Sequence, residues 1–211
     1  MKTNDLIGLL ALGAGEADPA DDAWRLGIGA ILALPVMVAA VAAGLGLLPM
    51  SLWQASATLP KLGYALVLML GGVTLLRMSG RPGSRLALPA LIIAVTLAAA
   101  TIVGVGDLLR QDPAVWATHI LGHSAPICPF AILALSVPAL IGTVRAARSL
   151  APTRLRLTGA AAGMAAGGLA AFAYSLGCTE GALTFVAVWY TAGVALATLL
   201  GAAIGPRFLR W

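Results

Sequence analysis

Residues 86–106 read LALPALIIAVTLAAATIVGVG and contain no charged side chain. A helix needs about 20 mostly apolar residues to cross the hydrocarbon core of a bilayer, and this run has that length. Charged side chains are costly in lipid, and their absence is typical of a membrane span. The stretch therefore predicts a transmembrane helix, bounded by Arg85 before it and Asp107 after it.

The composition of the whole chain leads to the same fold class. The chain has 211 residues, of which 60% are hydrophobic and only 10% are charged. A soluble globular domain carries about 25% charged residues. Thirteen Lys and Arg with eight Asp and Glu cannot cover such a surface, so lipid must be the solvent for much of it. The two cysteines are too few for a disulfide-rich scaffold or a multi-cysteine zinc site.

Five other apolar runs lie along the chain. We predict an all-α polytopic membrane protein with about six transmembrane helices in a domain of residues 26–211, after an N-terminal segment of residues 1–25. The predicted spans cover residues 26–48, 62–76, 86–106, 127–144, 157–177 and 182–204. The second run is short, so its helix is expected to start within the preceding loop, residues 53–60.

The basic residues indicate the orientation. Only Lys61 and Arg110 fall on one side of this topology. The other eleven fall on the opposite side: Lys2, Arg25, Arg77, Arg81, Arg85, Arg145, Arg148, Arg154, Arg156, Arg207 and Arg210. Because cytoplasmic loops carry the excess of Lys and Arg, we predict cytoplasmic N and C termini and a location in the bacterial inner membrane. Topology then accounts for the net charge of +5, and we expect no direct nucleic-acid binding.

The interior of the predicted spans limits the function. None of the six spans contains Asp, Glu, Lys, Arg or His. Pumps and ion-coupled transporters normally carry ionisable residues near the membrane midplane. Their absence disfavours a small permease or metal exporter, and it predicts that the function lies at the two membrane surfaces.

Glycines recur at every fourth residue of the fifth span, at Gly159, Gly163 and Gly167, with alanines between them. This spacing makes a smooth groove in which another helix can pack closely. Gly201 and Gly205 make a weaker version in the sixth span. We interpret both patterns as helix packing.

The topology brings both cysteines to the outer surface, Cys128 at the start of the fourth span and Cys178 after the fifth. The two helices form an antiparallel pair with axes expected about 8–10 Å apart. If the side chains face each other, a disulfide with Cα atoms about 5.5 Å apart is feasible in an oxidising compartment. The thiolates could instead share a soft metal ion. We predict a sensing or stapling role, with no cofactor except such a transient ion.

Polar residues are expected near the cysteines. They are Asp107, Asp112, His119, His123 and Glu180. His119 and His123 are four residues apart and share a face if their segment is helical. His119, His123 and Glu180 are therefore candidate additional metal ligands, and the alternative is that they are ordinary residues of interfacial loops.

The N-terminal segment is the candidate functional region on the cytoplasmic side, as the cysteines are on the outer side. Residues 1–12 are compatible with a short helix capped by Thr3 or Asn4, with Asp5 near its positive end. The helix would carry an apolar strip, Leu6, Ile7, Leu9 and Leu10. Such a strip suits a partner's groove, and the alternative is a helix lying on the membrane surface, which usually has a basic face that is absent here. The apolar run is brief, which disfavours a cleaved signal peptide.

Several motifs resemble the NrsF-like family of membrane anti-sigma factors, the negative regulators of sigma F. The resemblance covers the whole chain and rests on the order and spacing of the motifs. They are Met1-Lys-Thr-Asn-Asp-Leu-Ile7, Arg81-Pro-Gly83, Ala151-Pro152, the Gly-rich fifth span, Tyr174-Ser-Leu-Gly-Cys178-Thr-Glu180, Trp189-Tyr190 and Leu209-Arg-Trp211. One departure is Asn4, which stands where the family usually has a second acidic residue.

The resemblance implies a non-enzymatic regulator. Such a protein would hold an extracytoplasmic-function sigma factor at the membrane and release it when Cys128 and Cys178 sense metal or oxidative stress. The sigma-binding residues would be Thr3, Asn4, Asp5, Leu6, Ile7, Leu9 and Leu10. A membrane thiol oxidoreductase is the alternative from another class, but such enzymes usually use Cys-x-x-Cys pairs, and this chain has none.

Overall fold

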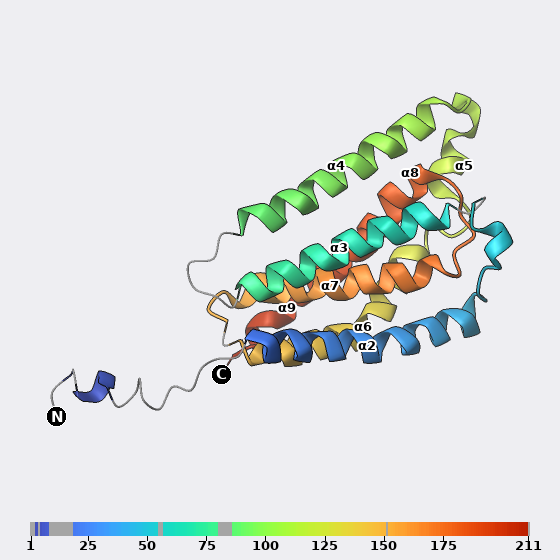
Figure 1. Ribbon diagram of the computed structural model, residues 1–211. Coiled ribbons are helices and arrows are strands. Elements are labelled where there is room, and N and C mark those ends of the chain that lie inside the picture. The colour runs from blue at the N-terminus through green and yellow to red at the C-terminus, as the bar shows by residue number, and fades with distance from the viewer. Residues whose placement is uncertain are drawn as a thin grey trace.

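The computed structural model describes residues 3, 5–8, 19–54, 57–79, 86–150 and 152–210, and for residues 19–31 the backbone alone. Within these ranges every regular element is a helix, as predicted (Figure 1). The longer helices are α2 Pro19–Gly44, α3 Thr58–Ser79, α4 Ala87–Leu109, α6 Cys128–Arg148, α7 Leu155–Ser175 and α9 Thr191–Phe208. Shorter elements are η1 Met50–Leu52, η2 Pro113–Val115, α5 Trp116–Leu121, α8 Leu183–Phe185 and the π-helical η3 Val186–Tyr190.

Each predicted span coincides with one of the long helices, the last with the continuous run α8–η3–α9. In the part of the chain whose side chains are described, five helices are long and apolar enough to cross a membrane: α3, α4, α6, α7 and the run Leu183–Phe208. In α2, the apolar part whose side chains are described, Leu32–Gly44, is shorter than a span. The predicted first span, residues 26–48, therefore stays a prediction.

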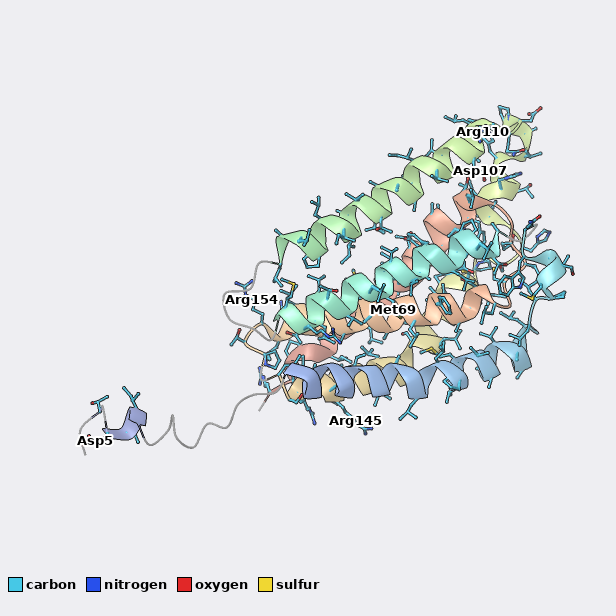
Figure 2. All side chains as sticks on the ribbon, viewed as in Figure 1. Asp5, Met69, Asp107, Arg110, Arg145 and Arg154 are labelled. Atoms are coloured by element: carbon cyan, nitrogen blue, oxygen red, sulfur yellow. The ribbon has the colours of Figure 1, made fainter. Side chains whose placement is uncertain are left out.

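The helices run alternately up and down. Figure 1 shows α2 beginning and α9 ending at the same end of the bundle. Arg154 lies at that end, and Arg110 lies at the opposite end, after α4 (Figure 2). We call the first the arginine end, marked by Arg145, Arg148, Arg154 and Arg207. The alternation agrees with the predicted topology, while the assignment of this end to the cytoplasm stays a prediction.

Helix α7 is the centre of the bundle (Figure 1). Of its apolar window, 78% is buried, against 17% for α4. It contacts α9, α3, α6 and α2. Its sequence of Gly and Ala explains this position, because small side chains allow neighbouring backbones to approach on several sides at once.

The predicted glycine groove is confirmed, and α9 fills it. A Cβ atom added to Gly159 would overlap the carbonyl oxygen of Gly201, and one added to Gly201 would overlap that of Gly159. Gly163 is equally close to the carbonyl of Ala197. On another face of α7, a Cβ on Gly168 would lie 2.6 Å from the backbone nitrogen of Met69 in α3. Helices α9 and α3 are thus packed on α7 at backbone contact.

Helix α4 lies at the outside of the bundle (Figure 1). Its buried residues are Pro89, Ile93 and Gly104. Two hydrogen bonds hold its C-terminal half to α8: the Leu183 backbone N–H donates to the Asp107 carboxylate at 3.0 Å, and the Thr184 hydroxyl donates to the Gly104 carbonyl at 2.7 Å. Most of α4 therefore presents apolar side chains to the surroundings, while one end is fixed.

Two helices extend beyond the predicted spans. Helix α3 begins at Thr58, within the loop where its start was expected, so Lys61 lies in its first turns. Helix α4 continues to Leu109 and includes Asp107. Lys61 and Asp107 thus lie in the end turns of these helices, just outside the predicted ranges 62–76 and 86–106, and Lys61 is completely buried.

Candidate functional site

The candidate site lies opposite the arginine end, where three parts of the chain meet. These are the start of α3, the loop of residues 122–127 before α6, and the loop of residues 176–182 after α7. We call this region the cysteine end, because Cys128 is the first residue of α6 and Cys178 follows α7 by three residues.

Both cysteines are buried, with 0% of Cys128 and 4% of Cys178 exposed, and both thiols are free. They belong to the same core cluster and are close enough to interact electrostatically. The topology therefore brings together two residues that are 50 positions apart in sequence, as the sequence analysis expected.

Backbone hydrogen bonds shape the loop that carries Cys178. The Tyr174 carbonyl accepts from the N–H groups of Gly177 and Cys178, each at 3.1 Å. The Leu176 carbonyl accepts from the Leu48 N–H at 2.9 Å, which ties the loop to the chain after α2. Gly177 has no room for a side chain, because a Cβ would lie 2.6 Å from the Val41 side chain. The loop is thus fixed to the end of α2.

Lys61 holds the same loop from α3. Its ammonium group donates to the carbonyl oxygen of Cys178 at 3.0 Å and to that of Glu180. Lys61 is 0% exposed. An uncompensated buried charge costs several kcal/mol, so these two acceptors and the nearby Glu180 charge are needed to keep the lysine here. Lys61 therefore clamps the loop on both sides of Thr179.

Glu180 continues the connection to α6. Its Oε1 atom accepts three hydrogen bonds, from the His123 N–H at 2.8 Å and from the N–H and hydroxyl of Ser124 at 3.1 Å each. Gly122 permits this approach: its φ is +52°, and a Cβ there would lie 2.5 Å from Glu180 Oε2. Glu180 thereby joins the loop after α7 to the loop that leads into Cys128.

Two tyrosines surround the thiols. The rings of Tyr174 and Tyr190 pack edge to face with centroids 5.8 Å apart. The Tyr174 side chain interacts with Cys128 and Ser124, and the Tyr190 side chain interacts with Cys178 and Ser175. The Tyr190 hydroxyl is buried, and none of the described residues meets it in full hydrogen-bond geometry. Each cysteine thus has one tyrosine beside it.

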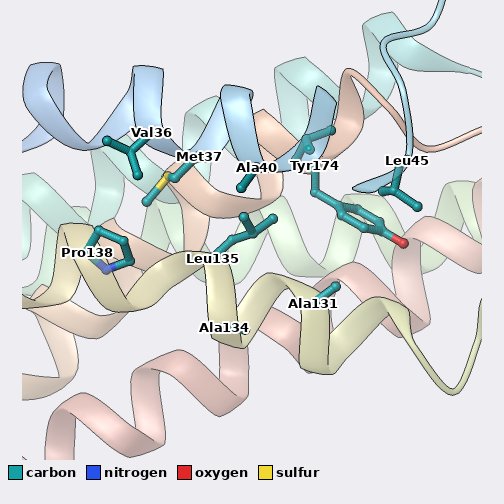
Figure 3. Close-up of a pocket in the computed structure, with 10 residues that line it drawn as sticks. Val36, Met37, Ala40, Leu45, Ala131, Ala134, Leu135, Pro138 and Tyr174 are labelled. Carbon is teal, nitrogen blue, oxygen red and sulfur yellow. The ribbon is translucent and has the colours of Figure 1, made fainter. Parts of the chain in front are cut away.

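Tyr174 also lines an apolar cavity of about 400 Å³ between α2 and α6. Figure 3 shows its ring at the opposite end of this cavity from Val36 and Pro138. The cavity offers little polar surface. Tyr174 therefore connects the cavity between α2 and α6 with the surroundings of Cys128.

The two histidines do not form the expected pair. Helix α5 ends at Leu121, and the positive φ of Gly122 turns the chain, so His119 and His123 do not share a helical face. The His123 side chain is 95% exposed, with Nδ1 3.9 Å from Glu180 Oε1. The Nδ1 atom of His119 is buried without a partner among the described residues. In the same ranges, no group of three or more His, Cys, Asp or Glu is arranged to hold a metal ion.

The predicted partner-binding segment is described only in part. Thr3 and residues 5–8 are helical, and Leu6 and Ile7 are 43% and 59% exposed. Asp5 is labelled on this turn in Figure 2. Asn4, Leu9 and Leu10 lie outside the described residues.

The sequence did not indicate Lys61, Tyr174 or Tyr190 as parts of the site. Lys61 was counted only as one of two basic residues on the sparsely charged side. Its position directly before a short apolar run was the available signal. The tyrosines stand within the motifs Tyr174–Cys178 and Trp189-Tyr190, which carried the family resemblance but no assigned role.

Comparison with known proteins gives a consistent result. The family model described as negative regulator of sigma F matches residues 10–211. A probable anti-sigma-F factor NrsF from Azospira oryzae is 32% identical, and the anti-sigma-F factor NrsF from Caulobacter vibrioides is 33% identical, each over the full length of both chains. No solved structure matches the chain. The chain belongs to the NrsF family of negative regulators of sigma F, and it is therefore an anti-sigma regulator rather than an enzyme.

Proposed function

We propose that this protein holds an extracytoplasmic-function sigma factor at the bacterial inner membrane and releases it when Cys128 and Cys178 react with a soft metal ion or an oxidant. The observation that carries the proposal is the hydrogen-bonded cysteine end, where both thiols are buried together and the surrounding loops are tied to α3 and α6. Family membership supplies the anti-sigma role.

Two reactions suit the thiol pair. A soft divalent metal ion would displace the protons of both thiols and bind the two thiolates. Alternatively, hydrogen peroxide would accept two electrons and the two thiol protons, forming a disulfide and two water molecules. Either reaction adds a covalent or coordinate link between the start of α6 and the loop after α7.

Lys61 would transmit this change from the loop to α3. Its two acceptors lie on the backbone on either side of Thr179, so a link at Cys178 that moves the loop also strains the Lys61 hydrogen bonds. Helix α3 carries Lys61 and packs directly on α7 through Gly168, so it would move with the loop. Shifting a two-state equilibrium from 1:99 to 99:1 takes about 5.5 kcal/mol of differential binding.

His119, His123 and Glu180 have a secondary role in the proposal. Glu180 is engaged by three donors, so metal binding at its carboxylate would release the loop before α6. His119 has a buried nitrogen available, and exposed His123 is next to Glu180. Each would act as an additional ligand to an ion held by the cysteines.

The N-terminal segment is the proposed sigma-binding element. Exposed Leu6 and Ile7 support this role, because an apolar strip on a short helix suits a groove on a protein partner. The full set of proposed contact residues is Thr3, Asn4, Asp5, Leu6, Ile7, Leu9 and Leu10.

The test uses the full-length protein in membranes that also contain the sigma factor, with a sigma-dependent reporter. The double variant Leu6→Ala/Ile7→Ala should lose co-purification of the sigma factor and raise reporter activity without any stress. The matched control is Leu88→Ala/Leu91→Ala, which removes two exposed leucines of α4 and should behave as the parent protein. Retained co-purification in the N-terminal variant would contradict the proposed binding segment.

A further inference from the structure

A groove lies between α6 and α9 near the arginine end, with a volume of about 490 Å³. Its lining combines apolar residues of both helices with two arginines. The residues on which the inference rests are Val137, Ile141, Arg145, Arg148, Leu200 and Phe208. The groove is separate from the cysteine end and shares no residue with it.

The groove has the length of one membrane leaflet. From Val137 to Arg148 the helix advances 11 residues, which is about 16 Å at 1.5 Å per residue. The hydrocarbon core of a bilayer is about 30 Å thick, so one leaflet contributes about 15 Å. Val137 and Ile141 are 42% and 48% exposed. The apolar part of the groove is thus long enough to follow an acyl chain, with the two arginines at one end.

The two arginines form a cationic end to the groove. Arg148 Nε donates to the carbonyl oxygen of Phe208, which holds this guanidinium between the ends of α6 and α9. Among the described residues, none accepts a hydrogen bond from its terminal N–H groups. Arg145 is one turn earlier on α6 and is exposed, and it projects from the surface of the bundle in Figure 2. No ion pair to either arginine is formed among the described side chains. Guanidinium groups recognise phosphate through two parallel N–H bonds.

From this geometry we infer that the groove binds an anionic phospholipid, with its phosphate on Arg145 and Arg148 and one acyl chain along Val137, Ile141 and Leu200. Basic pockets between transmembrane helices are suited to acidic headgroups. Charge complementarity and the leaflet-long apolar floor together select a lipid rather than a free anion. The bound lipid would hold the ends of α6 and α9 together, whatever the signal at the cysteine end.

The test measures thermal unfolding of the full-length protein in neutral detergent, with added phosphatidylglycerol, phosphatidylcholine or inorganic phosphate. A ligand that binds the folded state raises the unfolding midpoint, so phosphatidylglycerol should raise it by about 3–6 °C more than phosphatidylcholine. The variant Arg145→Gln/Arg148→Gln should lose this difference. The matched control Arg154→Gln/Arg156→Gln removes two exposed charges at the same end but outside the groove and should keep it.

Two further outcomes are decisive. Filling the apolar floor with Ile141→Trp should reduce the phosphatidylglycerol effect although both arginines remain, and an unchanged effect would contradict the acyl-chain site. An equal loss in both double-arginine variants would mean that only the total charge matters, and an equal shift with inorganic phosphate alone would mean a free-anion site. Either of these results would overturn the inference.

Discussion

The two ends of the bundle use their cations in opposite ways. At the cysteine end, Lys61 is fully buried and donates to two carbonyl oxygens of one loop. At the arginine end, Arg145 and Arg148 are exposed, and Arg148 has one backbone acceptor. The polar groups of the first end are therefore buried and depend on one another, whereas the second end exposes its guanidinium groups at the surface. Stability should respond to changes at the first, and binding to changes at the second.

The largest effect on stability is expected for Lys61→Met. The substitution leaves the Cys178 and Glu180 carbonyls without their donor, and hydrogen bonds to a charged group contribute about 1.5–3 kcal/mol each, so a loss of about 3 kcal/mol in unfolding free energy is predicted. Denaturant titration of the purified protein in detergent measures it. Arg110→Gln, an exposed basic residue at the same end, should change stability by less than about 0.5 kcal/mol. Equal losses in the two variants would contradict a clamping role.

A smaller loss is expected for Gly122→Ala. The new Cβ would lie 2.5 Å from Glu180 Oε2 on a backbone with φ of +52°, so the three hydrogen bonds to Glu180 would be distorted. Backbone strain of this kind costs about 1–3 kcal/mol. The control is Gly106→Ala, because nothing lies within 4 Å of a Cβ there, and helix propensity makes it neutral or slightly stabilising. If both variants had the same unfolding midpoint, the close approach of Glu180 would be unimportant.

The smallest loss is expected at the arginine end. Arg145→Gln/Arg148→Gln removes exposed charges, and each such site contributes at most about 0.5–1 kcal/mol, so stability without added lipid should change little. The same denaturant titration measures this, in parallel with Lys61→Met. A loss as large as that of Lys61→Met would remove the contrast between the two ends.

A change in the N-terminal segment should alter binding and leave stability unchanged. Asn4→Asp introduces an acidic residue where the family resemblance implies one, and a negative charge near the N-terminus of the proposed helix would contribute about 0.3–1 kcal/mol. We therefore expect up to about fivefold tighter binding of the sigma factor, measured by titration with the full-length protein. Weaker binding in this variant would show that the partner does not favour the extra charge.

Much of the fold could be predicted from the sequence because lipid imposes a simple pattern. Each predicted span coincides with a helix, and the groove of Gly159, Gly163 and Gly167 receives α9 as the spacing predicts. The approach of Cys128 and Cys178 also followed from topology. In an antiparallel pair, the start of the first helix lies beside the end of the second, and the two cysteines stand at these positions.

The polar structure of the cysteine end could not be predicted, because it depends on contacts between distant parts of the chain. The acceptors of Lys61 lie 117 and 119 residues away, so hydropathy alone cannot distinguish a loop lysine from a buried one. His119 and His123 do not share a helical face, because Gly122 adopts a positive φ that turns the chain between them. The carboxylate of Glu180, from a separate loop, occupies the space beside Gly122. Local periodicity contains no information about such partners.

The central claim is that the thiol pair at one end of the bundle controls the partner at the other. Its most direct test is release of the sigma factor from the full-length protein in membrane vesicles after addition of cadmium ions or peroxide. The parent protein should release it, and Cys128→Ser/Cys178→Ser should retain it under both treatments while binding it normally beforehand. Ser124→Ala, which alters the same loop but keeps both thiols, should still release it. Equal release from the parent and the double-serine variant would contradict the claim.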